Sequence, residues 1–108
     1  MTTSKYLQIK PETKAWLEAE VVSVVMDSYK VWADYGKTHN QKEPNLTVTM
    51  VQESLTSEPS DWTSLPRSRK ALYVLNALER ARTAGKLGSS LGVGLNGKEA
   101  RCYEPPAV

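Results

Sequence analysis

The sequence predicts a mainly α-helical α+β domain that ends in a β-hairpin. Two long segments, 12–36 and 65–83, repeat apolar residues at helical spacing, whereas residues 86–104 partly alternate on both sides of an Asn-Gly pair. Helical spacing indicates a helix with a buried face, and Asn-Gly between alternating segments is typical of a tight hairpin. A chain of 108 residues has the size of one domain, so we expect a single domain over residues 1–108.

The first predicted helix spans residues 12–36 and follows a lead, residues 1–10, that fits a frayed end or an edge strand. Pro11 suits the first turn of a helix, and Gly36 is placed to end it. The apolar arc is wider than a helix packed on one side requires. The helix therefore either runs through the middle of the domain or is partly covered by a second copy of the chain. The large side chains expected in such a dimer interface are Trp16, Val25, Tyr29 and Trp32.

The middle of the chain holds a loop, a short element and a turn-rich stretch. Residues 37–45 contain no apolar side chain and include Pro44, which indicates a loop. Thr47 is placed to cap a short helix over residues 47–55, although β-branched residues make a strand the competing interpretation. Residues 57–64 are rich in turn formers, with Trp62 expected to point inward. An extra helical turn around Asp61 and Trp62 is an alternative there.

The second long helix, from residue 64 or 65 to about residue 83, carries most of the positive charge. Residues 1–61 have six lysines against nine carboxylates, a net charge of −3, whereas residues 62–108 have eight cations against three carboxylates, a net charge of +5. Five of those eight cations lie between Leu65 and Arg82. A basic helix on an otherwise near-neutral domain favours a polyanionic partner, and DNA is the commonest one.

Two opposite faces of this helix are predicted to differ. The buried stripe is expected to consist of Ala71, Val74, Leu75 and Leu78. The opposite face is expected to consist of Arg69, Tyr73, Asn76 and Arg80, with Lys70 and Ala77 at the flank. Arginine can donate two hydrogen bonds to guanine, asparagine can pair with adenine, and tyrosine can reach a phosphate. Any surface helix also shows polar residues opposite its core, so the order of the neighbouring elements carries the argument.

A short helix, a turn, a long basic helix and a Gly-rich hairpin form the order of a winged helix-turn-helix. Over residues 46–104 the chain resembles the winged-helix family of DNA-binding transcription regulators, through the pattern of residues 71–87 and the returning strand 97–103. The resemblance implies that the 47–55 helix has a supporting role and that the 65–83 helix enters the major groove. It also implies that the wing meets the DNA backbone or the minor groove. The expected DNA-binding residues are Arg67, Arg69, Lys70, Tyr73, Asn76, Arg80 and Lys98.

Other chemistries are not favoured. His39 and Cys102 are the only residues of their types, too few for a zinc site. Residues 92–97 match a dinucleotide-binding fingerprint, but the eleven residues that follow cannot complete a βαβ unit. We expect no metal, no cofactor and no enzymatic activity. No segment approaches the length of a membrane span, and the lone cysteine fits a reducing interior, so an intracellular, cytoplasmic protein without a membrane partner is expected.

These features together predict sequence-specific binding of double-stranded DNA by a small transcription regulator that acts as a homodimer. The alternative is a non-catalytic protein–protein interaction module with a winged-helix-like fold, whose basic face meets an acidic partner.

Overall fold

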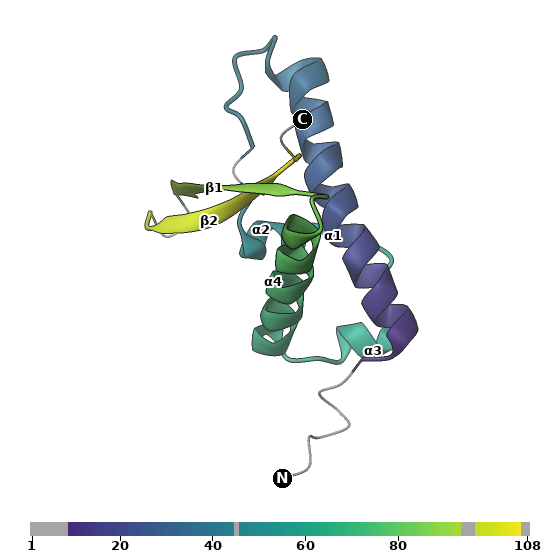
Figure 1. Ribbon diagram of the computed structural model, residues 1–108. Coiled ribbons are helices and arrows are strands. Elements are labelled where there is room, and N and C mark those ends of the chain that lie inside the picture. The colour runs from purple at the N-terminus through teal and green to yellow at the C-terminus, as the bar shows by residue number, and fades with distance from the viewer. Residues whose placement is uncertain (1–8, 45, 94–96, 107–108) are drawn as a thin grey trace.

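The chain folds as an α+β domain in which helices pack beneath and beside a two-stranded antiparallel sheet (Figure 1). The computed structural model describes residues 9–44, 46–93 and 97–106, so the expectation for residues 1–8 lies outside it. The elements in chain order are α1 (Pro11–Val31), the π-helical turn η2 (Trp32–Gly36), α2 (Val48–Glu53), α3 (Ser60–Thr63), α4 (Arg67–Thr83), β1 (Gly88–Val93) and β2 (Glu99–Glu104).

Helix α1 begins at Pro11, and η2 continues it to Gly36, so both predicted ends are confirmed. Its core-facing stripe consists of Leu17, Val21 and Val25, which are fully buried. Beyond this stripe, α1 and η2 extend past the sheet, and the following loop runs back toward it (Figure 1). We call this projection, residues 26–44, the arm.

The loop of the arm is held against its helix by two aromatic side chains. The Tyr29 hydroxyl donates to the carbonyl of Pro44 at 2.9 Å, and the Trp32 indole N–H donates to the carbonyl of Gln41 at 2.9 Å. Gly36 is buried between Trp32 and Gln41. A Cβ atom at this position would lie 2.8 Å from the Trp32 ring and 2.9 Å from the Gln41 side chain. The wide apolar arc of α1 is therefore used partly by the domain core and partly by this loop.

Two short helices follow the arm. The Thr47 side chain accepts a hydrogen bond from the Met50 amide, so the predicted cap is confirmed and residues 48–53 form a helix instead of a strand. The alternative of a helical turn around Trp62 is also confirmed, as α3, and Trp62 is only 1% exposed. Asp61 accepts bonds from the Lys10 amide and the Thr13 hydroxyl, which ties α3 to the start of α1.

Helix α4 begins at Arg67, two or three residues later than predicted. Proline disfavours the helical region for the residue before it, so Leu65 cannot start the helix and Pro66 becomes its N-cap. The helix ends at Thr83 as predicted, and Gly85 follows with a φ of +79°. This left-handed conformation is common after a helix and suits glycine.

The predicted hairpin is confirmed as β1 and β2, which pair in an antiparallel register from Gly88 opposite Glu104 to Val93 opposite Glu99. A single bridge joins Leu46 to Tyr103 at the other edge of β2, with the Tyr103 amide donating to the Leu46 carbonyl at 2.8 Å. Asn96, which the predicted turn requires, lies outside the described residues.

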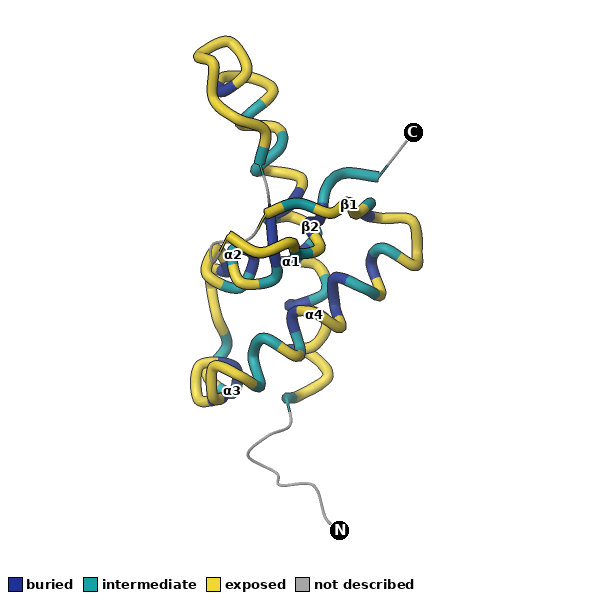
Figure 2. The backbone as a smooth tube through the Cα atoms, turned by 90° about the vertical axis from the view of Figure 1, so that its left-hand side faces the viewer, coloured by how far each residue is buried: buried dark blue, intermediate teal, exposed yellow. Residues whose placement is uncertain are grey.

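The buried face of α4 is rotated from the predicted stripe. Figure 2 marks the buried positions along the helix in dark blue. The buried residues are Val74, Ala77, Leu78 and Ala81. Leu75, predicted to be buried, is 38% exposed, whereas Ala77, predicted at the polar flank, is 1% exposed. Since α4 packs against α1, small side chains at positions 77 and 81 allow the two helices to approach closely.

This rotation predicts different costs for two leucines of the same helix. Leu78→Ala should lower the free energy of unfolding by about 2–5 kcal/mol, because Leu78 is completely buried. Leu75→Ala should cost less than about 1.5 kcal/mol, because much of this side chain already contacts water. Urea unfolding of both variants measures the difference. Equal losses would contradict the observed orientation of α4.

Candidate nucleic-acid interface

One strip of α4 faces solvent and carries side chains that can contact bases and phosphates. Arg69, Leu72, Asn76 and Arg80 lie within about 80° of one another around the helix. Asn76 and Arg80 are exposed, Arg69 is half-buried, and Leu72 is 47% exposed. Three of the four residues predicted to face DNA therefore share this recognition strip, with Leu72 added to them.

Tyr73 does not lie in the middle of the recognition strip. Its ring is half-buried and packs against the core, with its centroid 6.2 Å from that of Trp62. Trp62 is itself positioned by α3, a helix that the sequence offered only as an alternative. Tyr73 thus contributes to the contact between α3 and α4, and Leu72 takes the outward position beside Asn76.

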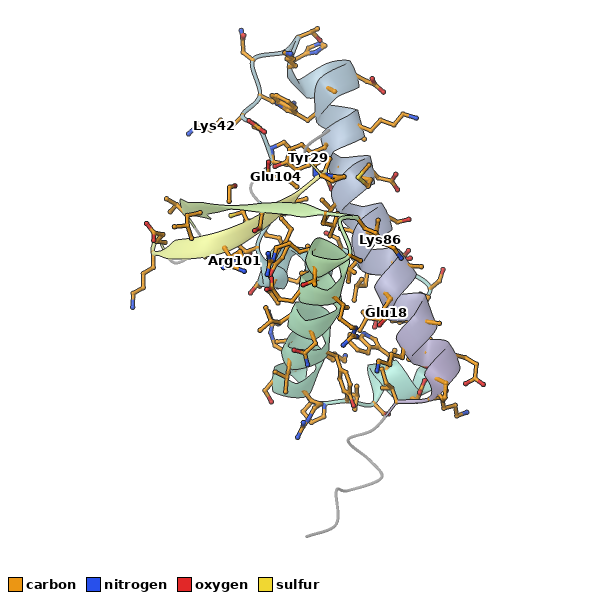
Figure 3. The ribbon with its side chains drawn as sticks, in the orientation of Figure 1. Glu18, Tyr29, Lys42, Lys86, Arg101 and Glu104 are labelled. Carbon is orange, nitrogen blue, oxygen red and sulfur yellow. The ribbon has the colours of Figure 1, made fainter. Side chains whose placement is uncertain are left out.

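Two basic side chains of α4 form ion pairs with other helices. Arg67 pairs with Glu53 of α2 at 2.8 Å, and Arg80 pairs with Glu18 of α1 at 2.7 Å. Figure 3 shows Glu18 between α1 and α4, with Lys86 nearby. All four paired side chains are at least 44% exposed, and such surface pairs contribute only about 0–1 kcal/mol. A phosphate can therefore replace either carboxylate at little cost.

The two other predicted cations of this helix are half-buried. Arg69 and Lys70 form no ion pair with any described residue. Lys98 is exposed beside Gly97, near the end of the hairpin distant from α1. The predicted DNA-binding residues thus occupy the first turns of α4, its recognition strip and the hairpin.

Glu79 is the centre of a hydrogen-bonded cluster that was not predicted from the sequence. Its carboxylate accepts hydrogen bonds from Arg82 at 3.0 Å, from Arg101 at 3.1 Å and from the Tyr103 hydroxyl at 2.6 Å. Figure 3 shows Arg101 on the side of the hairpin that faces α4. The available signal was that Glu79 is the only carboxylate of α4. The cluster fixes the hairpin against the C-terminal half of α4.

The pKa values of the cluster reflect these contacts. Hydrogen bonds from Arg82 and then Tyr103 lower the pKa of Glu79 to about 2, against the opposing effect of partial burial. Burial, followed by the hydrogen bond to Glu79, raises the pKa of the Tyr103 hydroxyl. The carboxylate is therefore charged and the phenol is neutral throughout the physiological pH range.

An open groove of about 530 Å³ lies beside this cluster, between α2, α4 and β2. It is lined by Thr47, Val48, Thr49, Leu75, Asn76, Glu79, Ala100, Arg101 and Tyr103. Asn76 belongs to both the groove and the recognition strip. A molecule that fills the groove would therefore contact a residue of the recognition strip.

The four residues predicted to form a dimer interface all make contacts within their own chain. Val25 is fully buried, so it offers no surface to a second copy. Trp16 packs edge-on against Trp62 with centroids 5.6 Å apart, and Tyr29 and Trp32 hold the loop of the arm. The large apolar side chains that are exposed on α1 and η2 are instead those of Met26, Val31 and Tyr35.

In the described part of the chain, no helix is long and apolar enough to cross a membrane. Among the same residues, no three or more His, Cys, Asp or Glu side chains are grouped so that they could hold a metal ion. Comparison with known proteins finds no matching family model, no matching curated protein and no matching solved structure.

The Glu79 cluster predicts a pH dependence of stability. A glutamate in an unfolded chain has a pKa of about 4.3, and the folded-state pKa of Glu79 is lowered to about 2. The carboxylate therefore contributes stability that is complete above about pH 5 and is lost as the pH falls toward about 2. Glu79→Gln should lower the free energy of unfolding at neutral pH by about 1–2 kcal/mol and flatten its decline over this range.

Urea unfolding at a series of pH values measures both effects. Glu99→Gln is a matched control, because Glu99 is an exposed carboxylate on β2 that forms no ion pair with the described residues. The interpretation of the cluster fails if Glu79→Gln and Glu99→Gln have the same pH profile.

Proposed function

We propose that this chain is a small transcription regulator that binds double-stranded DNA as a homodimer, with α4 in the major groove. The observation that carries this proposal is the recognition strip of Arg69, Leu72, Asn76 and Arg80 on a basic helix that leads directly into a projecting hairpin. The protein acts without chemistry, by occupying a DNA site.

The arrangement of elements supports a winged-helix interpretation. A long helix precedes the single bridged residue Leu46, and α2, α3 and α4 then lead to the hairpin. In that architecture the third helix of the core enters the major groove while the hairpin lies beside it as a wing. We count α3 as part of the turn, which is longer than in a tight helix-turn-helix. With α1 and α2 as the first two helices, α4 then corresponds to the third.

The charges of α4 support a nucleic-acid partner. The helix carries five cations and one carboxylate, and that carboxylate is occupied by Arg82, Arg101 and Tyr103. Arg69 is suited to guanine, Asn76 to adenine, and the exposed Leu72 to a thymine methyl group. Arg67 and Arg80 are suited to phosphates, which they reach by releasing their surface carboxylates.

The alternative of a protein–protein interaction module is favoured by one observation. Leu72 and Leu75 are 47% and 38% exposed, and Leu75 lines the groove between α2, α4 and β2. Exposed apolar side chains beside a groove are typical of protein docking surfaces. In this case the basic residues around them would meet an acidic protein.

Selection from a random duplex library tests the DNA-binding proposal. Affinity should fall steeply between about 50 and 200 mM salt, because lysine and arginine displace counterions from phosphates. Arg69→Ala and Asn76→Ala should each reduce discrimination between bases by about 1–3 kcal/mol. Lys98→Ala should weaken binding to all sequences alike.

Lys30→Ala is the matched control, because Lys30 is an exposed cation on the arm, away from α4. It should leave sequence preference unchanged. The absence of duplex binding at low salt would refute the DNA-binding proposal and leave the interaction module in its place.

A further inference from the structure

Strand β1 has an open edge. It pairs with β2 on one side, and β2 is bridged by Leu46 on its own far side. No other described segment forms a strand or bridge with the outer edge of β1. Ser89, Ser90 and Leu91 are all exposed, so this edge is accessible to another strand.

This edge lacks the features by which proteins usually prevent strand pairing. Natural edge strands carry lysine, proline or bulges, or they are very short. Residues 88–93 read Gly-Ser-Ser-Leu-Gly-Val, with no charge and no proline over six residues. Leu91 is 68% exposed and is the most exposed of the large apolar side chains in the described part of the chain.

We propose that two copies of the chain join through antiparallel pairing of β1 with β1 of the second copy. The sheet would then continue across a two-fold axis as four strands. Centring the axis on Leu91 sets this side chain against its symmetry mate. Leu91 pairs with Arg101, and Ser89 with Tyr103, within one chain. The shared face is therefore the one that carries the Glu79 cluster.

Charge explains why the second copy fits β1 better than it fits α1. Val31 and Tyr35 are 64% and 54% exposed on the arm, but Asp27 and Asp34 lie on the same flank at a spacing of seven residues. In a two-fold antiparallel pair of helices, like flanks meet, so these carboxylates would face each other. Pairing of β1 sets no charged residue of one strand against the other.

The symmetry has a consequence for the proposed function. A two-fold axis between antiparallel strands runs perpendicular to the sheet. Both copies of α4 would therefore lie on the same face of the four-stranded sheet. Two recognition strips on one side suit an inverted-repeat DNA site. The strand contact extends the homodimer of the proposed function, but it does not require DNA, so each proposal can fail without the other.

Sedimentation equilibrium of the full chain without DNA tests the contact. The wild type should dimerise at micromolar concentration, and Leu91→Lys should raise the dimer dissociation constant by about tenfold or more, because two lysines would lie opposite each other. Leu72→Lys is the matched control, because it changes an exposed leucine of α4 and should leave the dimer intact. Circular dichroism checks that both variants fold.

Cysteine cross-linking measures the register. Partner Cα atoms in an antiparallel pair are about 4.5–5.5 Å apart, within the range of a disulfide. Leu91→Cys, with the buried Cys102 changed to alanine, should form a disulfide-linked dimer on mild oxidation, whereas Leu72→Cys should not. Cross-linking at Ser90→Cys in its place would support the edge contact with the two-fold axis moved by one residue. A monomer at high micromolar concentration, or a dimer unaffected by Leu91→Lys, would overturn the proposal.

Discussion

The structure depends on the hydrogen bond between Tyr103 and Glu79. Tyr103 is fully buried, and its hydroxyl needs a partner inside the protein. Glu79 accepts that hydrogen bond at 2.6 Å, while the Tyr103 amide bonds to Leu46. The side chain and backbone of this one residue thus join β2 to α4 and to Leu46, which lies two residues before α2. Arg82 and Arg101 balance the charge that this arrangement draws into the cluster. This cluster therefore fixes how the hairpin is oriented against α4, and with it any surface that the hairpin and α4 form together.

The split of charge along the sequence has a structural counterpart. Carboxylates of the acidic first half, Glu18 and Glu53, reach across to arginines of the basic second half. The folded protein is therefore less polarised than the sequence suggests, and part of the basic surface of α4 is masked. Because these pairs are exposed and weak, they hold arginines in place without preventing an exchange for phosphate. Arg69 and Lys70 are the cations of α4 that have no ion pair to exchange among the described residues.

The same fold separates the apolar surfaces by their partners. The stripe of Leu17, Val21 and Val25 meets the domain core, and Tyr29 and Trp32 meet the loop of the arm. The wide apolar arc that the sequence pattern predicts for this helix is thus divided between two contacts in the same chain, the domain core and the loop of the arm. The open polar backbone of β1, with Leu91 beside it, is a different kind of surface. A sheet edge is completed by another strand, whereas a helix face is completed by side chains.

The sequence by itself determined the α+β class, both ends of the first helix, the Thr47 cap, the buried Trp62 and the hairpin, because each rests on local periodicity or on one residue's backbone preference. Tertiary structure decided which face of α4 is buried. Ala77 and Leu75 exchange their predicted roles because close packing against α1 favours the small side chain, which no periodicity records. The Glu79 cluster joins residues 22 and 24 positions apart. Such contacts depend on how the elements meet in space, and no local pattern in the chain encodes them.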